Sequence, residues 1–220
     1  MCGIVGFVNN KENKEKIIKD MSKKIEHRGP DGEGFYIDDN CALAHRRLAI
    51  IDLNTGAQPI YNEDKSKVII YNGEVYNFKE LKDALLKKKH VFKTKTDTEV
   101  ILHGYEKWGE KLPNHLRGMF SFAIWDKNKN ELFMARDGFG IKPLYYAKFN
   151  DTFMFASEPK AFLANPDFEK KLNTDILSAY LCFNSVPTSE TFFKGVYRLD
   201  PGTYLIYKDG KIKTKSFFKL

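Results

Sequence analysis

The sequence predicts a single α+β domain with two stacked, largely antiparallel sheets and helices on the outside. Short β-branched and aromatic runs follow one another in groups, without the strict strand–helix alternation that is typical of a parallel sheet. Four other segments carry apolar residues at helical spacing. A chain of 220 residues can bury a sizeable core, and no repeat, low-complexity tract or long linker divides it.

In the first half of the chain, an apolar run at 3–8 predicts a buried first strand. Ile17, Ile18, Met21 and Ile25 then recur at helical spacing. The remaining elements expected there are a helix at 14–25, a Gly/Pro-rich turn at 27–34, strands at 35–37, 41–52 and 68–71, a turn at Asn72-Gly73 and helices at 78–89 and 98–108.

The second half consists mainly of strands separated by turn residues. Lys208-Asp209-Gly210 is a strong hairpin signal between the last two of them. Strands are expected at 119–125, 131–135, 144–147, 153–155, 196–199, 204–207 and 212–215, with a helix at 176–183.

Composition argues against several classes of function. The net charge is +7, but only six of the 36 basic residues are arginine, so a solvated lysine surface explains the charge better than a nucleic-acid site does. No apolar run approaches the roughly 20 residues that span a bilayer, and polar residues from Asn9 onward rule out a signal peptide. No membrane or nucleic-acid partner is therefore expected. Three widely spaced cysteines indicate a reducing, cytoplasmic location and no structural disulfide.

Cys2 is the first candidate catalytic residue. Removal of Met1 would leave its thiol beside a free α-amino group with a pKa of about 7.7–8.0, which combines a nucleophile and a general base in one residue. The alternative is an ordinary half-buried cysteine on the first strand.

Five motifs occur in a fixed order and together resemble the class II glutamine amidotransferases, which are N-terminal nucleophile hydrolases. They are Cys-Gly-Ile-Val-Gly (2–6), His-Arg-Gly-Pro-Asp-Gly (27–32), Arg-Leu-Ala-Ile-Ile-Asp (47–52), Asn-Gly-Glu-Val-Tyr-Asn (72–77) and Arg-Asp-Gly-Phe-Gly-Ile-Lys-Pro-Leu-Tyr (136–145). The second and fourth motifs, with Ala-Ser-Glu-Pro-Lys-Ala at 156–161, look most like the glutaminase domain of glutamine-hydrolysing asparagine synthetase.

The resemblance implies a four-layer αββα sandwich, with residues 1–220 as the glutaminase domain. It further implies that a C-terminal, ATP-dependent synthetase domain is absent from this chain and is the partner of the glutaminase domain. No cofactor or metal is expected in residues 1–220, since ATP and Mg²⁺ would bind only in the synthetase domain. A homodimer is compatible with the resemblance.

The implied reaction is hydrolysis of L-glutamine through a Cys2 thioester. Asn72 and Gly73 match the family's oxyanion hole, with a side-chain amide beside a backbone N–H that we expect a tight turn to free. The alternative for this dipeptide is a plain hairpin turn.

Glutamine is a zwitterion, so its recognition needs a cation and an anion. Arg47 offers a bidentate partner for the α-carboxylate. Asp97 matches the family's ammonium-binding aspartate, with a helix N-cap as its alternative role, and Glu74 matches a further position near the ammonium. The substrate-binding segment also includes Leu48, Ile50 and Ile51.

The neighbouring polar residues are expected to support the site. Arg46 should lie on the opposite strand face as a surface charge. His27 and His45 are read as hydrogen-bonded scaffold, and Arg28 and Asp31 as supports of a loop that covers glutamine.

Three other functions remain open from the sequence. A related amidotransferase could deliver ammonia to another carboxylate, and an N-terminal nucleophile peptidase or acylase could share the terminal cysteine. A degenerate regulatory module is the non-enzymatic alternative, but it predicts loss of Cys2, Asn72 or Asp97, and all three are present.

Overall fold

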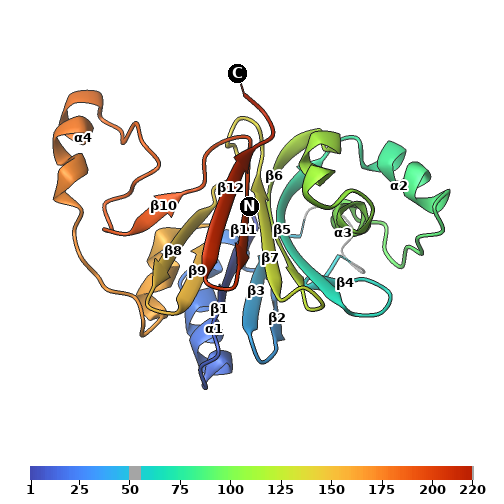
Figure 1. Ribbon diagram of the computed structural model, residues 1–220, viewed down its shortest axis with the longest axis horizontal. Helices are drawn as coiled ribbons and strands as arrows, with labels where there is room; N and C mark the ends of the chain where they lie inside the picture. The colour runs from blue at the N-terminus through green and yellow to red at the C-terminus, as the bar shows by residue number, and fades with distance from the viewer. Residues whose placement is uncertain (50–55, 220) are drawn as a thin grey trace.

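A computed structural model describes residues 1–49 and 56–219. Two six-stranded sheets lie face to face at the centre of the molecule (Figure 1). The β1 sheet has the strand order β10-β8-β9-β1-β3-β2, and the β5 sheet has the order β12-β11-β7-β6-β5-β4. Every strand pair in the described part of the two sheets is antiparallel.

The bounds of the elements follow the predicted order closely. The β1 sheet contains β1 (Gly3–Val8), β2 (Gly32–Ile37), β3 (Cys41–Arg47), β8 (Tyr145–Phe149), β9 (Thr152–Ala156) and β10 (Val196–Arg198). The β5 sheet contains β4 (Ile60–Tyr61), β5 (Lys67–Val75), β6 (Gly118–Asp126), β7 (Glu131–Arg136), β11 (Thr203–Lys208) and β12 (Lys211–Ser216). The helices are α1 (Lys14–Lys23), α2 (Phe78–Leu86), α3 (Asp97–Trp108) and α4 (Leu177–Phe183), with short 3₁₀ turns at Glu26–Arg28, Gly109–His115, Pro159–Ala164 and Thr174–Ile176.

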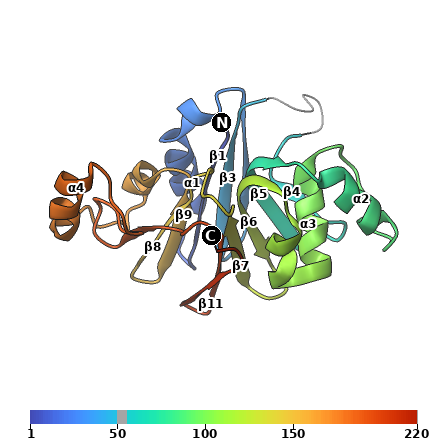
Figure 2. The ribbon, with the colours of Figure 1, turned by 90° about the horizontal axis from the view of Figure 1, so that it is seen from above.

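Three apolar clusters establish the four layers. One lies between the two sheets, one between the β1 sheet and α1, and one between the β5 sheet and the α2–α3 pair. Figure 2 shows α1 outside one sheet and α2 and α3 outside the other. The predicted αββα sandwich is therefore confirmed.

Burial on both faces explains why β1 reads as an unbroken apolar run. Ile4 and Val8 point into the layer between the sheets, whereas Val5 and Phe7 point toward α1. A strand with core on both sides cannot alternate between apolar and polar residues, and each large apolar side chain buried there contributes about 1.5–3 kcal/mol.

Two of the differences from the predicted boundaries affect the site. The strand expected at 41–52 ends at Arg47, and residues 50–52 lie outside the described part of the chain. The turn expected at Asn72-Gly73 does not form, because β5 continues to Val75 and pairs with β6 through Asn72↔Ser121 and Gly73↔Phe120.

The Arg136–Asp137 motif organises the turn after β7. The buried Asp137 carboxylate accepts backbone N–H groups of Phe120, Phe139, Ile141 and Lys142. The guanidinium of Arg136 donates to three backbone carbonyls, those of Lys142, Leu199 and Gly140. Because these bonds satisfy buried polar groups of the turn, the motif acts as scaffold.

In residues 1–49 and 56–219, no helix combines the length and the apolar character needed to cross a membrane.

Candidate active site

Cys2 lies at the start of β1 in a small cleft between the sheets. Its Sγ accepts the backbone N–H of Leu48 at 3.4 Å, and the carbonyl oxygen of Leu48 lies 3.6 Å away as an acceptor for the thiol. The cleft has a volume of about 110 Å³. Its lining consists of Cys2, His45, Arg47, Leu48, Gly56, Gln58, Tyr71, Gly73, Glu74, Thr96, Asp97 and Thr98.

Two of the sequence motifs hold Cys2 in place. Arg28 donates from Nε to the Cys2 carbonyl at 3.1 Å and from Nη1 to Glu158 at 2.9 Å. Ser157 bonds to both backbone groups of Ile4, through its Oγ at 3.0 Å and its N–H at 2.8 Å. The segments around residues 28 and 157 therefore fix the backbone on which the nucleophile sits.

The Glu158 carboxylate accepts hydrogen bonds from Arg28, His27 and Lys160. Burial opposes its charge, yet hydrogen bonds from Arg28, His27 and Lys160 lower the pKa of Glu158 to about 2. His27 Nε2 lies 2.8 Å from the same oxygen that Arg28 contacts, which confirms His27 as scaffold.

Asn72 lies on β5 in the layer between the sheets, next to Gly73, and is not among the residues that line the cleft. Side chains alternate along β5, so Asn72 lies on the face of Val68 and Ile70, which pack between the sheets. Asn72 is 2% exposed, yet its Nδ2 has no hydrogen-bond partner in the described structure. A buried donor without an acceptor is costly, so an oxygen arriving in this layer would complete it.

The free edge of β5 supplies a second donor. The Tyr71 N–H donates to Gln58 Oε1 at 2.7 Å, and the Val75 N–H donates to Asp97 Oδ2 at 2.9 Å. Backbone groups alternate in direction along a strand, so the Gly73 N–H lies on this same edge, away from β6. The Gly73 N–H is therefore available to the cleft because it lies on an unpaired strand edge, and not because a tight turn frees it as predicted.

Residue 73 is glycine for a steric reason. A Cβ at this position would lie 2.3 Å from the Met119 carbonyl oxygen and 2.7 Å from the Phe120 Cα. Only glycine permits β5 and β6 to approach this closely.

Asp97 joins α3 to β5. Its Oδ2 accepts the Tyr71 hydroxyl at 2.8 Å as well as the Val75 N–H, whereas the N-cap residue of α3 is Thr96. Burial raises the pKa of Asp97, because desolvation disfavours its charged carboxylate. A ligand ammonium would compensate a carboxylate in this position.

Arg47 and Glu74 also line the cleft, so the structure brings together Cys2, Arg47, Leu48, Gly73, Glu74 and Asp97. Ile50 and Ile51 lie outside the described residues. Asp31 supports the neighbouring loop by accepting the Ala49 N–H at 2.9 Å.

The prediction for Arg46 was right about the strand face and wrong about a surface position. Its side chain is only 11% exposed and lies 2.8 Å both from Ser22 Oγ and from Glu33. Arg46 contacts Ser22 of α1 on the face of β3 opposite to the cleft, because successive β3 side chains point to opposite sides.

Sequence reasoning missed Gln58 and Tyr71. Gln58 bonds to both backbone groups of Tyr71, and Tyr71 in turn holds Asp97. Tyr71 reads as an ordinary core position of an alternating strand, and nothing local distinguishes Gln58, so their roles appear only with the tertiary structure.

His45 provides a buried neutral imidazole beside the cleft. Its Nε2 lies 3.1 Å from the Tyr71 carbonyl, to which it donates as the neutral ring, and burial lowers the pKa of His45 to about 4. His45 therefore supports the β5 edge, as the sequence predicted.

Acidification should destabilise the protein through His45. The unfolded chain binds a proton near pH 6.5 and the folded chain only near pH 4, so stability falls as the pH drops from about 6.5 to 4. The loss reaches about 3 kcal/mol at 1.36 kcal/mol per pKa unit. Urea unfolding at pH 7.5 and 5 should show a smaller loss for His45→Gln than for wild type. His115→Gln, at an exposed position, should behave like wild type, and equal losses in all three would contradict the assignment.

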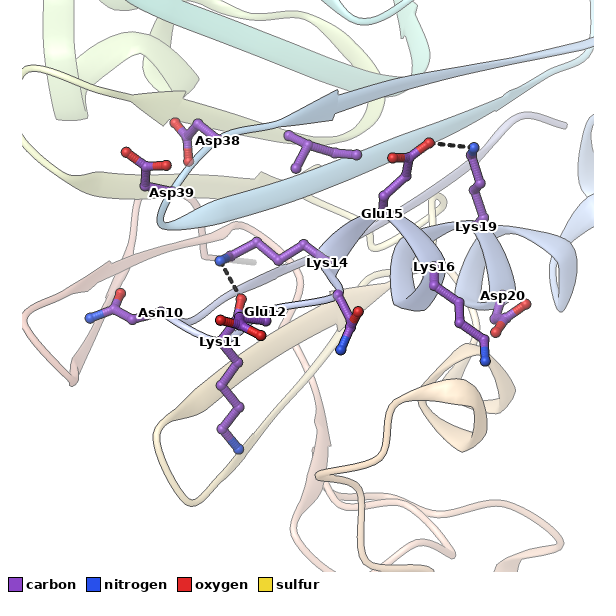
Figure 3. A pocket seen from close by; sticks show the side chains of 12 residues that line it. Asn10, Lys11, Glu12, Lys14, Glu15, Lys16, Lys19, Asp20, Asp38 and Asp39 are labelled. Atoms are coloured by element: carbon purple, nitrogen blue, oxygen red, sulfur yellow. Dashed lines mark hydrogen bonds and ion pairs between the residues drawn. The ribbon is translucent and has the colours of Figure 1, made fainter.

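A larger hollow lies elsewhere, at the start of α1 (Figure 3). Its labelled side chains are mainly lysines and carboxylates, and the Lys19–Glu15 pair in it is exposed to solvent. It contains no cysteine or histidine among its lining residues, so it offers no counterpart to the Cys2 cleft.

Comparison with known proteins decides the family. Residues 1–218 match the family described as "Glutamine amidotransferase domain". The chain belongs to this family. This glutamine amidotransferase domain is 43% identical over its full length to asparagine synthetase [glutamine-hydrolyzing] 1 of Bacillus subtilis and covers 35% of that protein. It is also 43% identical to asparagine synthetase [glutamine-hydrolyzing] 2 of the same organism, of which it covers 31%.

Solved structures confirm the fold. The domain superposes with a TM-score of 0.74 on an allosteric regulatory enzyme of purine biosynthesis, at 21% identity over 98% of this chain and 49% of that one. Glutamine phosphoribosylpyrophosphate amidotransferase from B. subtilis gives a TM-score of 0.69, with the same identity and coverage. The chain spans about a third of the length of the asparagine synthetases that it matches.

Proposed function

We propose that this domain hydrolyses L-glutamine to glutamate and ammonia, as the glutaminase part of an asparagine synthetase. One observation carries the proposal: the Cys2 thiol lies in a cleft that Arg47, Gly73 and Asp97 also line, and the buried Asn72 amide, next to Gly73 on β5, has no hydrogen-bond partner in the described structure. A thiol nucleophile, oxyanion donors and a charge clamp are what hydrolysis of a free amino acid amide requires.

The chemistry follows from these positions. After Met1 is removed, the α-amine of Cys2 accepts the thiol proton while Sγ attacks the amide carbon. Asn72 Nδ2 and the Gly73 N–H bind the resulting oxyanion. The carbon–nitrogen bond then breaks, and the proton held by the amine leaves with ammonia. Water, activated by the same amine, hydrolyses the thioester and releases glutamate with the thiol restored.

The test is an assay of the mature chain that begins at Cys2. Incubation with L-glutamine should yield ammonia and glutamate in equal amounts, and a glutamine-like electrophile should modify Cys2 alone, as mass spectrometry would show. The same chain with Met1 retained should be inactive, because its Cys2 nitrogen is an amide. Absence of ammonia from the mature chain, or equal activity with Met1 retained, would refute the proposal.

Arg47 and Asp97 should govern substrate binding. We expect Arg47→Ala and Asp97→Asn each to raise KM for glutamine at least about tenfold with a smaller effect on kcat, because charge partners hold substrate and transition state alike. Arg46→Lys is the matched control, since Arg46 lies on the other face of β3 and should leave KM unchanged. Steady-state kinetics distinguish the outcomes, and a fall in kcat at constant KM in both site variants would contradict these roles.

The ammonia acceptor is proposed to be an ATP-activated aspartate in a C-terminal synthetase domain. The names and lengths of the relatives support this, and so do the exposed apolar side chains of Leu181 and Phe183 on α4. None of the α4 residues is buried, and Figure 1 shows α4 standing away from both sheets, as a helix would that packs on another domain.

Cofactor requirements divide in the same way. ATP and Mg²⁺ are proposed to act only in the synthetase domain, and catalysis by Cys2 needs neither. This chain, incubated with glutamine, aspartate, ATP and Mg²⁺, should release ammonia and form no asparagine. Chromatographic detection of asparagine would refute the proposal that asparagine formation needs the synthetase domain. Failure to release ammonia would refute the proposed glutaminase activity. The free thiols of Cys2, Cys41 and Cys182 support a cytoplasmic, reducing location for the protein.

A further inference from the structure

Three segments far apart in the sequence bring metal-ligating side chains together beside α3. Glu63 follows β4, His90 lies in the loop between α2 and α3, and His103 lies within α3. One potential ligand atom from each lies within 4.8 Å of the others. Glu106, one turn after His103, adds an Oε2 that is 2.8 Å from His103 Nδ1 and 3.5 Å from His90 Nδ1. None of these residues lines the Cys2 cleft.

The two carboxylates of this cluster are held in place by further hydrogen bonds. Glu106 Oε1 accepts Asn62 Nδ2 at 2.7 Å, and Glu63 Oε1 accepts the Val91 N–H at 3.2 Å. Their other oxygens remain directed at the imidazoles, with Glu63 Oε2 3.8 Å from His103 Nδ1. Such supporting bonds are typical of the outer shell of a metal centre.

The second nitrogen of His103 faces a carboxylate behind the cluster. The residue is 1% exposed, yet its Nε2 has no hydrogen-bond partner among the described residues. Glu99 Oε1 lies 3.8 Å from that nitrogen and accepts the Lys93 N–H, while Glu99 Oε2 accepts the Thr94 N–H. A metal that draws His103 Nδ1 toward Glu63 and His90 would leave Nε2–H facing Glu99, the carboxylate–histidine pairing found behind metal ligands.

We propose that Glu63, His90 and His103 bind a zinc ion, with Glu106 as the fourth ligand. Two imidazoles with carboxylates favour zinc over calcium or magnesium, which take oxygen ligands only. A ligand set of four protein side chains leaves no open position, which is typical of a structural site. The ion would tie the β4–β5 turn and the α2–α3 loop to α3, the helix that begins at Asp97.

The competing arrangement is a metal-free ion network. His103 already bonds to Glu106, and Lys67 Nζ lies 4.0 Å from Glu106 Oε1, where it opposes a cation. The proposal departs from the sequence prediction of no metal in this domain. That prediction considered spacing along the chain, whereas this cluster is assembled by the packing of α3 against the β5 sheet.

Zinc titration of the EDTA-treated full chain tests the proposal. A Cys2→Ala background removes the accessible cleft thiol, which could itself bind zinc. We expect one saturable site by calorimetry, a rise in Tm with zinc, and a Co²⁺ absorption spectrum of tetrahedral intensity. His90→Ala and Glu63→Gln should each weaken zinc binding at least about tenfold.

Glu63 is exposed and His90 is half-buried, so Glu63→Gln is the milder change, and circular dichroism of both metal-free variants checks that they fold. His115→Ala is the matched control, an exposed histidine just beyond α3 that should leave zinc affinity unchanged. Absence of saturable binding, or an affinity equal in His90→Ala, Glu63→Gln and His115→Ala, would overturn the site. Glutaminase activity is not the readout, so this result stands apart from the proposed function.

Discussion

Replacement of Cys2 with alanine should abolish glutamine hydrolysis. The thioester cannot form without Sγ, and no second cysteine can substitute, since Cys41 is buried and Cys182 is on α4, away from the cleft. Substrate binding should survive, because Arg47 and Asp97 remain. Ammonia release should therefore fall to background while calorimetry still detects glutamine binding.

Cys182→Ser is the matched control for this variant. It removes an exposed thiol and should retain wild-type kcat and KM. Turnover of Cys2→Ala at the wild-type rate would contradict the nucleophile assignment. Loss of activity in both cysteine variants would instead indicate damage unrelated to the cleft.

Replacement of Asn72 with alanine should lower kcat by about 10²–10³-fold, with little change in KM. This is the effect of losing one oxyanion donor, which acts mainly on charge that develops in the transition state. Asn72 Nδ2 makes no hydrogen bond in the free protein, so its removal should cost little stability. Kinetics and urea unfolding of the same variant measure the two effects separately.

Ser121 offers a matched control for Asn72. It pairs with Asn72 across β5 and β6, and its Oγ is likewise buried without a hydrogen-bond partner. We expect Ser121→Ala to keep kcat near wild type. An Asn72→Ala enzyme with unchanged kcat and a raised KM would show that the Asn72 amide binds the ground state and not the oxyanion.

The sequence by itself determined most of the helices and strands, and it supplied the proposal that Cys2 is the nucleophile. Periodicity identified α1 and α3, the hairpin signal at 208–210 was confirmed between β11 and β12, and ordered motifs identified Cys2. These features are local, because side-chain spacing along a strand or helix is set by backbone geometry alone.

Only the tertiary structure decided how the site is completed. The Asn72-Gly73 dipeptide favours a turn locally, but pairing with β6 overrides that preference, and the Met119 carbonyl leaves room for glycine only. In the same way, Gln58 and Tyr71 position Asp97, and His90 meets His103, through packing between distant segments. Contacts of this kind depend on which surfaces of the folded layers fit together, and no spacing along the chain encodes them.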